Sequence, residues 1–89
     1  MSRKRSQEKI QTSDFVSIGE LVSLTGARYS TLKYYTEEGM IPFEQEGQNL
    51  TRRYKRETTV DRIYYIKSLR DQNWTIPDIK KHLKALDEK

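Results

Sequence analysis

The sequence predicts a mainly α-helical domain of four helices with one small β-hairpin. Three features lead to this prediction: apolar residues recur at helical spacing, capping residues and glycines mark the segment ends, and one extended stretch carries a proline. The 89 residues are enough for one domain. A chain this short buries only about 60% of its unfolded surface, so the core is expected to be small.

The first two predicted helices form a closely joined pair. Ser17 and Glu20 make a capping box, in which each side chain bonds a free backbone N–H at the helix start. Gly26 ends this helix because glycine readily adopts the left-handed conformation. A second helix is predicted over residues 28–38 and ends at Gly39. Two helices separated by a short turn with a glycine are typical of a helix-turn-helix.

An extended hairpin is predicted after the second helix. Pro42 disfavours helical geometry at the residue before it, so residues 40–43 are expected to form one strand and residues 51–54 the other. A two-stranded hairpin is only marginally stable alone in water, so this one must pack against the helices. The side chains expected at that contact are Ile41, Phe43 and Tyr54.

Two more helices are predicted towards the end of the chain. Thr58 and Asp61 provide a capping signal for the third helix, which Asn73 closes in the left-handed conformation. Thr75 caps the fourth helix, and Pro77 lies in its first turn, where a missing N–H breaks no helical hydrogen bond. The predicted folded domain covers residues 14–87.

The composition argues against several classes of protein. The chain has no cysteine and one histidine, so neither disulfides nor a metal site is expected. No apolar run approaches the roughly 18 residues of a membrane span, and no nucleophile with a base or phosphate-binding loop occurs. We therefore expect a cytoplasmic protein without enzyme activity or cofactor. An acidic group is interpreted as a solvated rim; its members are Glu37, Glu38, Glu44 and Glu46.

Positive charge gathers in three places along the chain. The formal net charge is +4, and the basic clusters are the N-terminal segment, the surroundings of Lys33 and the block RRYKR at 52–56. Such clustering suits a polyanion, and nucleic acid is the first candidate. Residues 1–13 are interpreted as a flexible basic arm, with a leader or cloning remnant without a role as the alternative.

Two adjacent tyrosines on the second predicted helix are expected to point in different directions. If Leu32 faces the core and each residue advances about 100°, Tyr35 lies about 60° from Leu32 and Tyr34 lies on the opposite side. Tyr34 then faces outward with Arg28 and Lys33 beside it. An outward tyrosine there can contact sugar, phosphate or a base edge. The alternative is that Tyr34 only covers a neighbouring loop.

The block RRYKR is expected to be extended, so alternate side chains face opposite ways. Arg53 and Lys55 share one face, and Arg52, Tyr54 and Arg56 share the other. Tyr54 is interpreted as the inward anchor, and all four cations can reach DNA phosphates. The alternative is a solvated basic loop that serves solubility.

Residues 15–83 resemble the DNA-binding domain of the mercury-resistance regulator (MerR) family. The shared marks, in order, are I-G-E-L, T-G, T-L-K-Y-Y for the family's T-L-R-Y-Y, an E-x-G turn before a proline, R-R-Y, and I-x-x-L-R before the last helix. The resemblance implies a winged helix-turn-helix. It also implies a bacterial, nucleoid-associated transcription regulator that binds inverted repeats in double-stranded DNA as a dimer.

The resemblance, with the charge pattern, gives a set of expected DNA-contacting residues. Free N–H groups and the helix dipole meet at Ser17, so a phosphate is expected there. The full set is Ser17, Arg28, Tyr29, Ser30, Lys33, Tyr34, Arg52, Arg53 and Lys55. Arg28 and Ser30 stand where the family usually has a small residue and an arginine, so the base preference is expected to differ. Thr36 replaces a common glutamate.

The resemblance leaves dimerisation and regulation open. Typical members continue into a long dimerisation helix and an effector domain, whereas this sequence stops at Lys89. We expect no small-molecule effector site within it. We interpret it as a fragment, or as a small member that pairs through its arm, through another surface or only on DNA. Two alternatives remain: an excisionase-like, plasmid, phage or chromosome-anchoring DNA-binding protein, and a protein-interaction module on the same fold.

Overall fold

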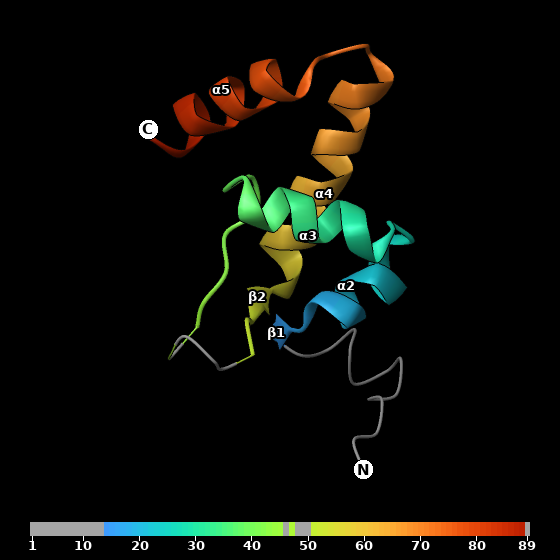
Figure 1. Cartoon of the computed structure of the whole chain (residues 1–89), viewed down its shortest axis with the longest axis vertical. Helices are drawn as coiled ribbons and strands as arrows, with labels where there is room; N and C mark the ends of the chain where they lie inside the picture. Colours follow the sequence, from blue (N-terminus) through green and yellow to red (C-terminus); the bar gives the residue numbers. More distant parts are fainter. Residues whose placement is uncertain (1–13, 46, 48–50, 89) are drawn as a thin grey trace.

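The computed structural model describes residues 14–45, 47 and 51–88. Within these residues the fold is mainly helical, with four helices and one antiparallel pair of strands, which confirms the predicted fold class. The elements are β1 (Phe15–Val16), α2 (Ile18–Thr25), α3 (Tyr29–Glu37), β2 (Tyr54–Lys55), α4 (Arg56–Asp71) and α5 (Ile76–Asp87). The predicted basic arm, residues 1–13, lies outside the described residues. In Figure 1, α3 crosses in front of α4, with β2 below it and α5 above it.

The helix ends follow the capping signals of the sequence. At the start of α2 the Glu20 amide donates to the Ser17 hydroxyl oxygen at 3.2 Å, and the Ser17 amide donates to the Glu20 carboxylate at 2.8 Å. Thr75 caps α5 by accepting the Asp78 amide hydrogen at 3.3 Å. Three turns after helices contain a residue with positive φ; these are Gly26 at 74°, Gly39 at 72° and Asn73 at 69°.

The start of α4 differs from the prediction. The helix begins at Arg56 rather than after Thr58, and no side chain caps it. The reason lies in the sheet, because the Arg56 amide donates to the backbone carbonyl of Asp14 at 2.8 Å. A backbone carbonyl from a distant part of the chain therefore accepts a free N–H at the helix start, as a capping side chain does in α2 and α5.

The strand β2, which belongs to the predicted hairpin or wing, has partners on both sides. Its residues Tyr54 and Lys55 pair antiparallel with Val16 and Phe15, a partner strand that the sequence pattern did not indicate. The predicted hairpin is present among the described residues as a single bridge between Glu44 and Arg53, with hydrogen bonds of 2.7 and 2.8 Å. Residues 40–43, predicted as its first strand, do not form a strand, and Met40 and Ile41 are instead buried in the core.

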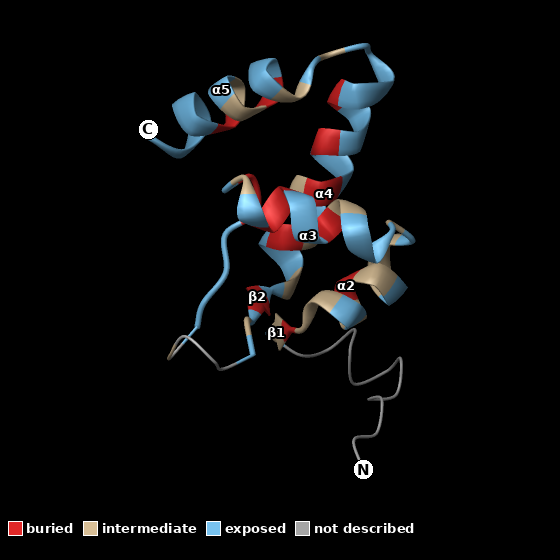
Figure 2. Cartoon of the chain, viewed as in Figure 1, coloured by how far each residue is buried: buried red, intermediate tan, exposed pale blue. Residues whose placement is uncertain are grey.

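The core joins α3 to the wing on one side and to the two C-terminal helices on the other. Figure 2 shows buried positions where α2, α3, α4 and β2 meet, and again on α5. The buried apolar residues are Val16, Leu21, Leu32, Tyr35, Met40, Ile41, Tyr54, Ile63, Ile66, Leu69, Ile79 and Leu83. Of the expected hairpin contacts, Ile41 and Tyr54 are fully buried, whereas Phe43 stays 38% exposed.

Candidate nucleic-acid interface

The outer face of α3 is free of core contacts. Tyr35 is 9% exposed whereas Tyr34 is 45% exposed, which confirms the predicted opposite orientations of the two rings. Tyr29 is 56% exposed, and Ser30 and Lys33 are exposed on the same helix. The helix therefore presents a row of hydroxyl and ammonium groups to solvent.

Two further predicted residues lie where helices begin. Arg28 is the N-cap residue of α3, is exposed, and makes no side-chain capping hydrogen bond. Ser17 is half-buried, and its hydroxyl oxygen is engaged by the Glu20 amide. The Glu20 carboxylate beside Ser17 makes this helix start less favourable for an anion than the sequence alone suggested.

The wing cations are stacked on aromatic rings. The Arg52 guanidinium carbon lies 4.6 Å from the centre of the Phe43 ring, and that of Arg53 lies 5.7 Å from the centre of the Phe15 ring. Such cation–π contacts are worth roughly 0.5–1 kcal/mol at exposed sites. They restrain the two arginines, and Lys55 beside them is exposed.

The alternation predicted for RRYKR holds from Arg52 to Lys55: Arg53 and Lys55 are exposed, whereas Arg52 is half-buried and Tyr54 is buried. The prediction is wrong at Arg56, which is not extended but is the first residue of α4. The Tyr54 ring packs against the Phe43 ring, with 6.2 Å between their centres. One inward tyrosine thus anchors the whole basic block.

A buried hydrogen bond joins the wing to α3. The Thr36 hydroxyl donates to the Leu32 carbonyl at 2.8 Å, and the Tyr54 hydroxyl lies 2.9 Å from the Thr36 oxygen. Because the single Thr36 proton is used by Leu32, Tyr54 is the donor in this second bond. The orientation of the wing relative to α3 is thereby tied to a residue that replaces the glutamate common in the resembled family.

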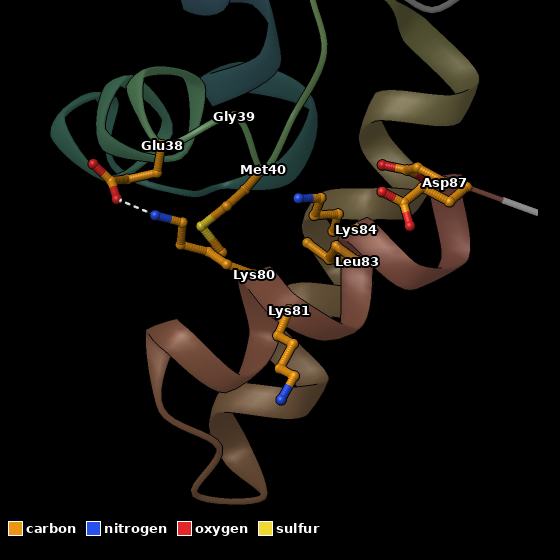
Figure 3. A pocket seen from close by; sticks show the side chains of 9 residues that line it. Glu38, Gly39, Met40, Lys80, Lys81, Leu83, Lys84 and Asp87 are labelled. Carbon is orange, nitrogen blue, oxygen red and sulfur yellow. Dashed lines mark hydrogen bonds and ion pairs between the residues drawn. The ribbon is translucent and has the colours of Figure 1, made fainter.

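Polar contacts hold α5 against the end of α3. In Figure 3 the Lys80 ammonium reaches the Glu38 carboxylate, at 2.7 Å, beside the buried Met40. This hydrogen bond, together with the carboxylate charge, raises the pKa of Lys80. Glu38, predicted to belong to a solvated rim, is instead half-buried and paired; Glu37 and Glu44 are exposed, and Glu46 lies outside the described residues.

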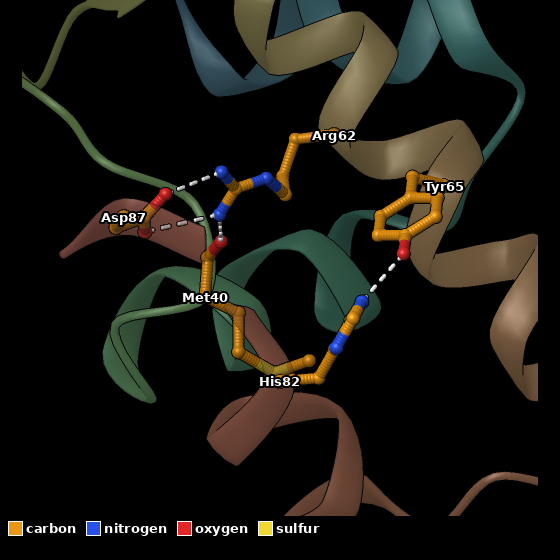
Figure 4. A network of polar contacts seen from close by, with 5 residues as sticks. All are labelled: Met40, Arg62, Tyr65, His82 and Asp87. Atoms are coloured by element: carbon orange, nitrogen blue, oxygen red, sulfur yellow. Dashed lines mark hydrogen bonds and ion pairs between the residues drawn. The ribbon is translucent and has the colours of Figure 1, made fainter. Parts of the chain in front are cut away.

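Figure 4 shows a second group of contacts, centred on Arg62. Its guanidinium donates to the Asp87 carboxylate at 2.7 and 3.3 Å and to the Met40 carbonyl at 3.4 Å. The hydrogen bond from Arg62 lowers the pKa of Asp87. Nearby, the Tyr65 hydroxyl lies 2.6 Å from the His82 ring nitrogen, which links α4 to α5. No pattern in the sequence indicates these pairings, because they join residues of different elements.

A comparison with protein families shows the family to which this fold belongs. The family described as "MerR HTH family regulatory protein" matches residues 16–86, which is most of the chain. The chain belongs to this family. The α2–α3 pair is therefore the helix-turn-helix of a MerR-family regulatory protein, and the resemblance seen in the motifs is confirmed.

Two curated proteins are similar in sequence to the chain. The mercuric resistance operon regulatory protein of Bacillus cereus is 34% identical over 70 residues, which are 79% of this chain and 52% of that protein. The nodulation protein NolA of Bradyrhizobium elkanii is 31% identical over 68 residues, 76% of this chain and 31% of that protein. The chain thus spans about half or less of these relatives. No solved structure matches it significantly.

The described part of this MerR-family chain gives two further findings. None of its helices has both the length and the apolar character needed to cross a bilayer. No three potential metal-ligating side chains of His, Asp or Glu come together in it. The features that stand out are the exposed face of α3 and the aromatic-stacked cations of the wing.

Proposed function

We propose that this MerR-family domain regulates bacterial transcription by binding double-stranded DNA sequence-specifically, as a dimer on an inverted repeat. The observation that carries the proposal is the exposed face of α3, where Tyr29, Lys33 and Tyr34 project while the opposite face is buried. A helix with one such free face fits the major groove, which is about 12 Å wide. We further propose that residues 14–87 act as the DNA-binding unit in the cytoplasm, without enzyme activity and without an effector site of their own.

The proposed contacts divide into base reading and backbone binding. Residues on the outer face of α3 approach base edges, whereas the helix starts and the wing bind phosphates. In the first group are Tyr29, Ser30, Lys33 and Tyr34, and in the second are Ser17, Arg28, Arg52, Arg53 and Lys55. Tyr34 is amphipathic, so its ring contributes apolar contact to a thymine methyl and its hydroxyl contributes a donor.

The first experiment is a selection of genomic fragments by the purified chain. The expected result is an inverted repeat with a fixed half-site spacing, because two-fold symmetric dimers recognise half-sites at spacings set by the protein. Enrichment of flexible pyrimidine–purine steps without a shared motif would instead support an accessory, DNA-shaping protein. Recovery of no fragment above background would refute DNA binding by this chain.

The second experiment tests the wing. Replacing Arg52 and Arg53 by glutamine should weaken the salt dependence of binding. The magnitude of the slope of log affinity against log salt should fall by about 1.8, because each lost phosphate contact removes about 0.9. The matched control replaces Lys81 and Lys84, two exposed cations of α5, and should leave the slope unchanged. An unaltered slope in the arginine variant would show that the wing does not lie on the DNA backbone.

A further inference from the structure

Phe43 is a large apolar side chain that the core does not take up. In the same segment after α3, Met40 and Ile41 are buried, whereas Phe43 is 38% exposed. The next residue, Glu44, forms the backbone bridge to Arg53, so the chain beside Phe43 is held in the hairpin. An exposed phenylalanine at a fixed backbone position is suited to contacts other than core packing.

The Phe43 ring contacts an arginine and a tyrosine of the wing. The centre of the ring lies 4.6 Å from the guanidinium carbon of Arg52 and 6.2 Å from the centre of the Tyr54 ring. Arg52 and Tyr54 are two positions apart, and alternation in an extended segment places both on one face. Phe43 therefore joins the half-buried Arg52 to the tyrosine that anchors the wing.

These contacts continue to α3. The Tyr54 hydroxyl lies 2.9 Å from the Thr36 hydroxyl of α3, in the buried hydrogen bond described above. Thr36, Tyr54 and Phe43 thus form an unbroken series of contacts from the proposed base-reading helix to a cation of the wing. Of the two stacked arginines, Arg52 is also the closer to its ring, at 4.6 Å against 5.7 Å for Arg53.

The contact with Phe43 leaves the hydrogen-bonding capacity of Arg52 unused. Among the described residues, the Arg52 side chain forms no hydrogen bond or ion pair. A cation–π contact uses the charge of the guanidinium, so its N–H donors stay available to an acceptor outside the chain. Arg52 is thus restrained before it meets DNA, and a side chain restrained beforehand loses less conformational entropy on binding.

We propose that Phe43 is a positioning residue for DNA specificity, because it holds the Arg52 guanidinium at a fixed place relative to α3. Phosphate contacts fix how a protein lies on the duplex. With Arg52 fixed, α3 and the wing engage together only where the flanking backbone lies at a matching distance from the major groove. That distance varies with the sequence-dependent shape of DNA, so Phe43 contributes to sequence preference without contacting a base. This inference rests on the proposed function, in which Arg52 binds a phosphate.

The test measures affinity for two duplexes: the tightest fragment from the genomic selection, and a scrambled duplex of equal length and composition. Phe43→Leu should lower the preference for the selected fragment about two- to fivefold, which is the equivalent of one exposed cation–π contact. The loss should come from weaker binding of the selected fragment alone, because non-specific binding depends on charge rather than on a fixed geometry. The slope of log affinity against log salt should stay unchanged, since Arg52 keeps its charge.

Three further variants separate positioning from a merely structural role. Phe43→Trp retains a ring and should keep the preference of the unchanged chain. Tyr65→Leu removes an exposed ring of α4, away from the wing, and should also keep it. In the background of Arg52→Gln, adding Phe43→Leu should change nothing further, because the guanidinium that Phe43 holds is already absent.

A measurement on the free chain tests the stacking without DNA. An aromatic ring shifts the NMR signals of protons above its face upfield, so the δ protons of Arg52 should move downfield in Phe43→Leu and stay in place in Tyr65→Leu. Thermal unfolding of each variant verifies that it is folded.

Several results would overturn the inference while the unchanged chain still preferred its fragment. They are an unchanged preference or a reduced salt slope in Phe43→Leu, a lost preference in Phe43→Trp, an equal loss in Tyr65→Leu, a further loss in the Arg52→Gln background, and unmoved Arg52 signals. Failure of the unchanged chain to prefer the selected fragment over the scrambled duplex would overturn the proposed function itself.

Discussion

The hydrogen bond between Thr36 and Tyr54 gives an asymmetric prediction about stability. Both residues are buried, with exposed fractions of 4% and 1%, and their oxygens lie 2.9 Å apart. Tyr54→Phe removes the donor, but the Thr36 hydroxyl keeps its other bond to the Leu32 carbonyl. This variant should lose about 0.5–1.5 kcal/mol of unfolding free energy, the net worth of a typical hydrogen bond.

Thr36→Val should cost more, although it removes the same hydrogen bond. The Tyr54 hydroxyl then stays buried without a partner, and leaving such a group unsatisfied costs about 1–3 kcal/mol. In a domain of this size each kcal/mol lowers the melting temperature by about 4–8 °C. The double variant, in which neither hydroxyl remains, should be close in stability to Tyr54→Phe alone.

Urea unfolding of the three variants, followed by circular dichroism, measures these differences. The expected coupling energy between the two positions is at least about 1 kcal/mol, which a double-mutant cycle resolves. Two results would refute the reasoning: a greater loss in Tyr54→Phe than in Thr36→Val, or additive losses in the double variant. Either would mean that the hydroxyl pair does not stabilise the junction of α3 and the wing.

Three further predictions concern single positions. Tyr34→Ala should weaken DNA binding with an unchanged melting temperature, whereas Tyr35→Ala should lose about 3–5 kcal/mol in urea melts, as large aromatic core truncations do; equal losses would contradict the assigned orientations. Ser17→Ala should lower the free energy of unfolding by about 1 kcal/mol in the same melts, which is the usual contribution of an N-cap. An unchanged free energy of unfolding would mean that the capping box does not stabilise the fold. Because Arg62 lowers the pKa of Asp87, their pair stabilises the fold above the ordinary carboxyl pKa and loses that effect as pH falls through the lowered value. Arg62→Gln should therefore flatten the fall in stability below about pH 4, and a curve of unchanged shape would rule the pair out.

Local signals in the sequence predicted most of the fold. Ser17, Gly26, Asn73 and Thr75 each specify a helix end through their own backbone or side-chain chemistry, and all four were placed correctly. The start of α4 was not, because the Asp14 carbonyl that accepts its first amide comes from far away in the sequence. A strand of two residues has no alternation to detect, so the pairing of β1 with β2 was equally invisible.

The candidate interface was predictable to a similar degree. Helix geometry alone separated Tyr34 from Tyr35, and alternation alone placed Tyr54 inside the wing. Packing between separate elements places the Phe43 ring under Arg52 and brings Arg70 close to α3. Neither the helical nor the strand periodicity of the sequence contains this information. For this chain, sequence periodicity gives the direction of a side chain within its element but not its partner in another.

The Arg62 guanidinium joins the end of α5 to the segment that follows α3. Its planar set of donors forms hydrogen bonds to the Asp87 carboxylate near the end of α5 and to the Met40 carbonyl, which precedes the wing. A displacement of the end of α5 would break either the ion pair between Arg62 and Asp87 or the hydrogen bond between Arg62 and the Met40 carbonyl. The end of α5 is thereby joined through one side chain to the segment from which the wing extends, 47 positions earlier in the chain.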